Sequence, residues 1–193
     1  MKIYKKVDEK WILKVQSGAV FLHPTDTTWA ISSSAFSSKG YQNLQLITKE
    51  QSNEPTTILV DSIPRLKKYI YQLHPRVETL LSFHHRPITL LFREIKMLPS
   101  HLLDHNGFAA ICMVQDKRIK KMINILNHPL IYKPLKTSLN SYATTIDMIQ
   151  SKIKENSDFI YHPSGHLFSQ PDVGKPPVIA RVKTDGGLLF PKN

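Results

Sequence analysis

Short apolar runs with strand character alternate with helix-patterned segments along the whole chain, and this alternation restricts the possible folds more than any other feature. Runs such as Thr56–Val60 and Phe108–Val114 are apolar or β-branched, which is typical of buried strands. Segments such as Lys117–Leu126 instead repeat apolar residues at helical spacing. The intermixed order predicts an α/β (or α+β) fold with a large, mixed, twisted sheet flanked by helices.

The same patterns predict the approximate bounds of each element. The first predicted helix is capped by Asp8 and ends at Gly18. The other predicted helices are Lys39–Glu50, Ser62–Tyr71, Arg76–Phe83, Lys117–Leu126 and Thr144–Lys154. Predicted strands are Ala19–His23, Thr28–Ser33, Thr56–Val60, Pro87–Phe92, Phe108–Val114, Asp158–Tyr161 and Val178–Val182. Leu135–Asn140 is expected to lead from a strand end into a loop, and Pro163–Pro177 to be a loop. We find no repeat or linker, so residues 1–193 are expected to form one domain.

The charge balance indicates the class of partner. Lys and Arg total 26 against 15 Asp and Glu, a formal net charge of +11. Such a surface favours nucleic acid, nucleotides or an acidic membrane face, although solubility alone would also explain it. The single cysteine excludes an intramolecular disulfide, and no signal peptide or long apolar run is present. We therefore expect a soluble, cytoplasmic protein.

Several common catalytic motifs are absent. The sequence contains no G-x-G-x-x-G, no P-loop and no G-x-S-x-G. His101 and His105 are four residues apart, but their surroundings indicate a loop, so solvated histidines are favoured over a metal site. Cys112 lies inside an apolar run and is expected to be a buried, inert thiol. We expect no metal site.

Three short segments carry a stronger signal. The first is the tight segment His23–Ala30 between two predicted strands, where hydroxyl side chains and an exposed aromatic would suit an anionic ligand; an ordinary turn is the alternative. The second is Lys49, which could complement a helix C-terminus or meet a phosphate. The third is Thr137–Asn140, which follows a predicted strand end, where open α/β sheets bind their ligands.

In order and spacing, these segments resemble the YrdC/YciO-type family, whose active members are threonylcarbamoyl-adenylate synthases. The family pattern is P-T-D/E-T-x-Y-G, K-x-R, P-G-P-x-T-L, an apolar strand containing arginine, S-T-S-A-N and a terminal R-x-G. This chain offers Pro24–Ala30, Lys49-Glu50-Gln51, Arg86–Leu90, Phe108–Val114 and Pro134–Asn140. The resemblance extends from about Gly18 to Pro191 and implies a YrdC-like fold.

The departures from the pattern are concentrated at charged positions. Three arginines of the family correspond here to Gln51, Cys112 and Phe190. A late serine or threonine is replaced by Pro176-Pro177, and the first motif ends in Trp29-Ala30 rather than tyrosine and glycine. Each lost arginine removes charge-assisted hydrogen bonds to phosphate or carboxylate oxygens. Unchanged synthase activity would need other basic residues, such as Arg86 or Arg181, to reach the pocket.

The resemblance implies a reaction and a set of site residues. In the family, threonine and bicarbonate form a carbamate that attacks the α-phosphate of ATP, and the product serves tRNA modification. Carried over by position, the pocket for threonine and nucleotide comprises Thr25, Thr27, Trp29, Lys49, Ser138 and Asn140. An active enzyme would need ATP and Mg²⁺; a binding protein would need no cofactor.

The resemblance also implies a basic surface for double-stranded RNA. Two basic runs on predicted helices would supply it, comprising Arg65, Lys67, Lys68, Lys117, Arg118, Lys120 and Lys121. Solvated helix faces are the plainer interpretation of each run alone. The sequence therefore predicts a divergent protein that binds RNA or tRNA and nucleotide, with synthase activity weakened or lost. An active L-threonylcarbamoyl-adenylate synthase, or a pocket for another small anion, is the alternative.

Overall fold

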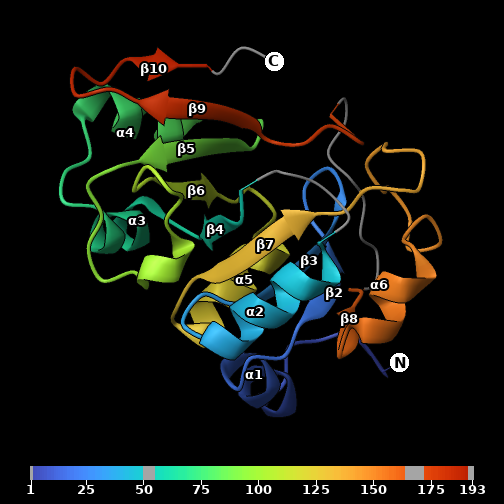
Figure 1. The fold of residues 1–193 in the computed structure, drawn as a ribbon. Helices are drawn as coiled ribbons and strands as arrows, with labels where there is room; N and C mark the ends of the chain where they lie inside the picture. The colour runs from blue at the N-terminus through green and yellow to red at the C-terminus, as the bar shows by residue number, and fades with distance from the viewer. Residues whose placement is uncertain (1, 50–54, 164–171, 191–193) are drawn as a thin grey trace.

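The computed structural model describes residues 2–49, 55–163 and 172–190. Within these ranges one sheet of ten strands runs in the order β1-β8-β2-β3-β7-β4-β6-β5-β9-β10 (Figure 1). The strands are β1 Lys2–Tyr4, β2 Phe21–Pro24, β3 Trp29–Ser34, β4 Thr57–Val60, β5 Ile88–Phe92, β6 Ala109–Met113, β7 Leu130–Pro134, β8 Phe159–Tyr161, β9 Val178–Val182 and β10 Leu188–Leu189. Parallel and antiparallel pairs both occur, which confirms the predicted α/β fold with a mixed sheet.

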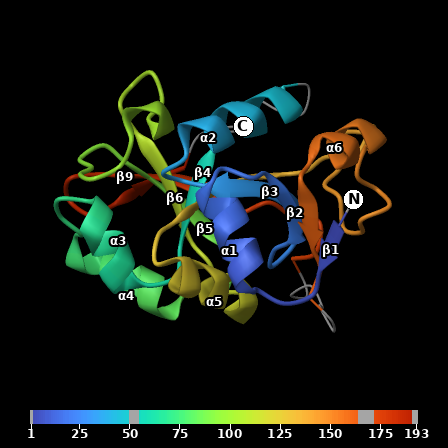
Figure 2. The ribbon, with the colours of Figure 1, turned by 90° about the horizontal axis from the view of Figure 1, so that it is seen from below.

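Helices cover both faces of this sheet (Figure 2). The described residues form α1 Glu9–Gln16, α2 Ser38–Ile47, α3 Ile63–Tyr69, α4 Pro75–Phe83, α5 Lys117–Leu126, α6 Ser151–Asn156 and a short 3-10 helix, Ser100–Leu102. α1 and α5 contribute buried residues to one hydrophobic cluster, and α2, α3, α4 and α6 contribute to the other. None of the helices in the described ranges has the length and apolar character needed to span a bilayer.

Local sequence accounts for several element ends. The Asp8 carboxylate accepts a hydrogen bond from the Trp11 amide at 2.7 Å and caps α1, as predicted. Ser62 caps α3 in the same way, with its hydroxyl accepting from the Arg65 amide at 3.3 Å. Gly18 follows α1 at φ +91°, a conformation that L side chains rarely adopt. The two caps define where α1 and α3 begin, and Gly18 lets the chain turn from α1 towards β2.

The predicted helix Thr144–Lys154 is wrong in its first half, because α6 begins only at Ser151. Ile146 and Ile149 show helical spacing, yet a single turn brings both to the core, closed by the Ile149 amide donating to the Ile146 carbonyl at 3.2 Å. Just before this turn the chain is tied to β3, since the Trp29 amide donates to the Ala143 carbonyl at 2.7 Å. Tertiary hydrogen bonds therefore override the local helical pattern here.

Other differences concern strands. β7 ends at Pro134, so Leu135–Asn140 lies wholly beyond the strand. β1 and β10 were not expected from the sequence, and both lie at the edges of the sheet. β8 lies between β1 and β2, where the Phe21 and Phe159 rings stack with centroids 5.2 Å apart.

Candidate functional site

The tight segment between β2 and β3 is a closed, buried turn. The Thr25 amide and hydroxyl both donate to the Thr28 carbonyl, at 2.8 and 2.9 Å. Trp29 follows as the first residue of β3 and is 2% exposed, so the expectation of an exposed aromatic at this point is wrong. Trp29 packs in the hydrophobic core.

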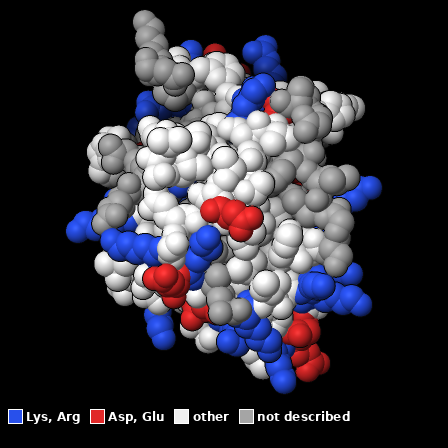
Figure 3. All heavy atoms as spheres, turned by 90° about the vertical axis from the view of Figure 1, so that its right-hand side faces the viewer, with Lys and Arg blue, Asp and Glu red and all other residues white. Residues whose placement is uncertain are grey.

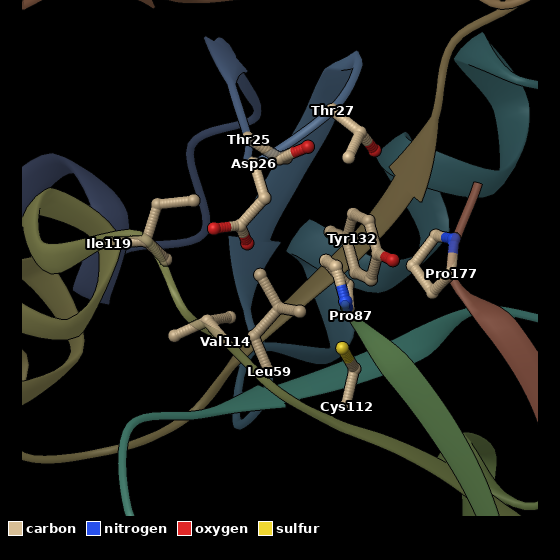
Figure 4. Close-up of a pocket in the computed structure, with 10 residues that line it drawn as sticks. All are labelled: Thr25, Asp26, Thr27, Leu59, Pro87, Cys112, Val114, Ile119, Tyr132 and Pro177. Atoms are coloured by element: carbon tan, nitrogen blue, oxygen red, sulfur yellow. The ribbon is translucent and has the colours of Figure 1, made fainter. Parts of the chain in front are cut away.

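The turn forms one wall of a small hollow on the α5 side of the sheet (Figure 4). Residues from four strands or strand ends, from α5 and from the segment before β9 surround it: Thr25, Asp26, Thr27, Leu59, Pro87, Cys112, Val114, Ile119, Tyr132 and Pro177. Its volume is about 10 Å³, room for about one water molecule. In this conformation the hollow is too small for an amino acid or a nucleotide.

Asp26 is the charged side chain of the hollow, and sequence reasoning missed it as a site residue. It is 7% exposed, and one carboxylate oxygen accepts from the Gln115 amide at 3.4 Å. Burial, reinforced by the nearby Asp116 carboxylate, raises its pKa from 3.8 to about 6. Its place inside the P-T-D-T motif was the available signal. Asp26 can therefore exchange a proton close to neutral pH.

Cys112 lies in β6 with its sulfur facing the hollow (Figure 4). It is 2% exposed, and burial raises the pKa of the thiol to about 12. The side chain is therefore a neutral thiol at physiological pH, and the expectation that Cys112 is buried is confirmed.

A segment before β9 borders the hollow through Pro177. We call residues 172–177 the strap. The Thr27 hydroxyl donates to the Lys175 carbonyl at 2.6 Å, and the Gly174 amide donates to the Thr27 carbonyl at 2.8 Å. The Val178 amide donates to the Pro87 carbonyl at 3.3 Å, next to Pro177. The strap is thus held against both the turn and the start of β5.

The other predicted pocket residues lie away from the hollow. Lys49 is exposed just beyond the end of α2. Ser138 and Asn140 are exposed in a loop closed by a bridge between Lys136 and Tyr142, with Asn140 at φ 62°. This loop starts beside β3, because the Leu135 amide donates to the Trp29 carbonyl at 2.9 Å. Only Thr25 and Thr27 of the predicted set line the hollow.

The positions of the missing arginines are only partly described. Gln51 lies outside the described residues. Phe190 follows β10 at the far edge of the sheet and is 55% exposed. Of the two that the structure describes, Cys112 lines the hollow and Phe190 does not.

The predicted basic surface is smaller than expected. Arg65 is 7% exposed and donates from Nε to Asp61 at 2.6 Å, so assigning it to a surface was wrong. Lys67 is paired with Glu78 at 2.6 Å, and Arg118 is paired with Asp116. The remaining cations of the two runs are Lys68, Lys117 and Lys121, which are exposed, and Lys120, which is partly buried in a neighbouring groove.

One face of the molecule shows how its charges are distributed. On the face that carries α6, Lys and Arg atoms lie mainly around the rim, and Asp and Glu atoms lie both among them and near the middle of the face (Figure 3). In the part of the chain that the structure describes, no group of three His, Cys, Asp or Glu side chains could hold a metal ion.

The fold is that of the Sua5/YciO/YrdC class. The Sua5/YciO/YrdC family model, whose description reads "Telomere recombination", matches residues 14–172. The chain belongs to this family. It is 23% identical over 182 residues to a candidate threonylcarbamoyl-AMP synthase of Methanocaldococcus jannaschii, an alignment covering 94% of this chain and 83% of the relative.

Solved structures show the same fold. YciO of E. coli superposes with a TM-score of 0.77 at 15% identity, covering 98% of this chain and 91% of YciO. Sua5 of P. abyssi, in a complex with L-threonine, superposes with a TM-score of 0.70 at 14% identity over 93% of this chain. The chain spans 53% of the length of that Sua5.

Proposed function

We propose that this chain is a nucleotide- and RNA-binding member of the family in which threonylcarbamoyl-adenylate synthesis is weakened or lost. The observation that carries the proposal is the neutral floor of the hollow, where Cys112 holds an uncharged thiol at the position that resembles the family's arginine. Attack of a carbamate on an α-phosphate depends on cations held against the phosphate oxygens. A thiol cannot supply that charge, so the transition state loses stabilisation.

The closed strap supports the same conclusion. A hollow that holds about one water molecule has no room for ATP and threonine together. Binding of both substrates in the hollow would therefore require release of the hydrogen bonds between Thr27 and the strap. That release lowers the apparent affinity and the rate, because only the open fraction of molecules can react.

An active L-threonylcarbamoyl-adenylate synthase is the second candidate. It is favoured by two cations that pair with Asp172, namely Arg86 before β5 and Lys175 in the strap, which could replace the family arginines. In this reaction the threonine amine and bicarbonate give a carbamate and water. A carbamate oxygen then bonds to the α-phosphorus while the bond to pyrophosphate breaks. By resemblance, Lys49 would contact phosphate, and Ser138 and Asn140 would hold nucleotide oxygens, with Mg²⁺ brought in by ATP.

Pyrophosphate release from ATP, measured with and without threonine and bicarbonate, separates the two candidates. We expect little or no release that depends on both substrates. The Lys49→Ala variant tests the phosphate contact, and Lys10→Ala on the exposed side of α1 is the matched control. Robust turnover that collapses in Lys49→Ala but not in Lys10→Ala would overturn the weakened-synthase proposal and establish the enzyme.

RNA binding is proposed to use the exposed cations of α3 and α5, namely Lys68, Lys117 and Lys121. Contacts to phosphates release counterions, so the affinity for a double-stranded RNA should fall steeply with salt. The Lys117→Gln/Lys121→Gln double variant should reduce the slope of log affinity against log salt by roughly 2. An affinity that does not change with salt contradicts this surface.

A further inference from the structure

A carboxylate on the strap lies between two cations that come from different parts of the chain. Asp172 Oδ1 is 3.6 Å from Arg86 Nε and 3.7 Å from Lys175 Nζ. The three side chains form a small ionic cluster, which we call the rim cluster. One anionic group is thus shared by two cationic groups, so the cluster carries net positive charge.

The rim cluster adjoins the hollow on two sides. Arg86 directly precedes Pro87, and Lys175 stands two residues before Pro177; both prolines line the hollow (Figure 4). The backbone holds these neighbours in place, because the Lys175 carbonyl accepts from the Thr27 hydroxyl at 2.6 Å. Both cations are therefore carried by backbone segments that border the hollow.

The ion pairs within the cluster are weak and replaceable. Their distances exceed the roughly 2.7–2.9 Å of a good charge-assisted hydrogen bond. The side chains of Arg86 and Lys175 are 45% and 55% exposed, so water screens both pairs. A phosphate group carries more negative charge and more acceptor oxygens than a carboxylate, and it can outcompete Asp172 for both cations.

The position of Arg86 in the sequence is also informative. When His85–Leu90 is set against the P-G-P-x-T-L pattern, Arg86 occupies the place of the pattern's glycine. An arginine is thus gained near the hollow in a chain that has a thiol at Cys112 in its floor. The other arginine considered from the sequence, Arg181, lies over the Phe108 ring at 4.5 Å and does not line the hollow.

We propose that Arg86 and Lys175 bind the phosphate oxygens of the incoming nucleotide, and that Asp172 occupies this anion position until the nucleotide displaces it. The inference rests on the proposed nucleotide binding and names the residues that perform it. Displacement of Asp172 also frees the strap from its ionic contact with Arg86, just before β5. Phosphate binding and opening of the hollow are therefore coupled.

Calorimetric titration with ATP tests the proposal, because the cation variants and the Asp172 variant should change the affinity in opposite directions. Arg86→Gln and Lys175→Gln should each weaken ATP binding about tenfold, which is about 1.4 kcal/mol. Asp172→Asn should strengthen binding by up to about fivefold, because it removes the competing anion and leaves both cations. Arg181→Gln is the matched control and should bind ATP as the wild type does, and thermal unfolding should show that all four variants are folded.

The outcomes separate the two levels of the proposal. If the wild type binds ATP and neither cation variant changes its affinity, the role of the rim cluster is overturned and nucleotide binding stands. If Asp172→Asn weakens binding, Asp172 is a positive contributor and the displacement idea fails. If neither the wild type nor Asp172→Asn binds ATP, the proposed nucleotide binding itself is refuted.

Discussion

Replacing Asp26 by asparagine is expected to stabilise the folded protein at neutral pH and to have little effect in acid. The native carboxyl has its pKa raised from 3.8 to about 6, chiefly by burial. A rise of this size corresponds to about 3 kcal/mol, at about 1.4 kcal/mol per pKa unit. Between these pH values the folded protein retains a proton that the unfolded chain has released, so stability falls as the pH rises through this window. Asparagine carries no such penalty.

The assay is urea unfolding, followed by circular dichroism, of wild type and Asp26→Asn at several pH values. The variant should gain up to about 3 kcal/mol above pH 7 and almost nothing below about pH 4. The Gln115 amide keeps an acceptor, because the asparagine oxygen can take the place of the carboxylate oxygen. Asp147→Asn, at an exposed position, is the control and should show no pH-dependent gain. An equal difference at both pH extremes, or a variant that is less stable at pH 8, would refute the reasoning.

Three further substitutions or treatments test the packing. Gly18→Ala should lower the free energy of unfolding by at least about 1–2 kcal/mol, because Gly18 has φ +91° and an added Cβ would clash with the Ser37 hydroxyl. The control is Gly107→Ala, which has φ +77° but no atom within 4 Å of the added Cβ. It should cost clearly less in the same urea measurement. Asp8→Ala should cost about 1 kcal/mol through loss of the α1 cap, and Asp8→Asn much less. The Cys112 thiol should resist iodoacetamide at pH 8 in the folded protein and react once guanidinium unfolds it, and rapid labelling of native protein would contradict its burial.

Elements with a strong local pattern were predictable. α5 has the predicted bounds, because Ile119, Met122, Ile123 and Leu126 all fall on one face and are all buried. β1 was not predictable, since it is short, only Tyr4 is buried, and it exists because it pairs with β8. A local pattern cannot report a strand that distant partners induce.

The candidate site also has parts that the sequence could predict and parts that it could not. The motif around Thr25 and Thr27 marked one wall of the hollow from sequence alone. The floor comes from β4, β6 and β7, and its neutrality at Cys112 also followed from the motif comparison. The strap contact to Thr27 and the pairing of Arg86 with Asp172 depend on the tertiary fold, so sequence reasoning could name Arg86 only as a possibility.

The position of β8 between β1 and β2 has a consequence for synthesis of the chain. β1 and β2 both pair with β8, a strand that is synthesised much later than they are. Until Phe159 has been made, the rings of Trp11 and Phe21 lack the aromatic partner that completes their cluster. A nascent or truncated chain that ends before β8 therefore exposes these rings. Such a chain is expected to bind chaperones or to aggregate more readily than the complete fold.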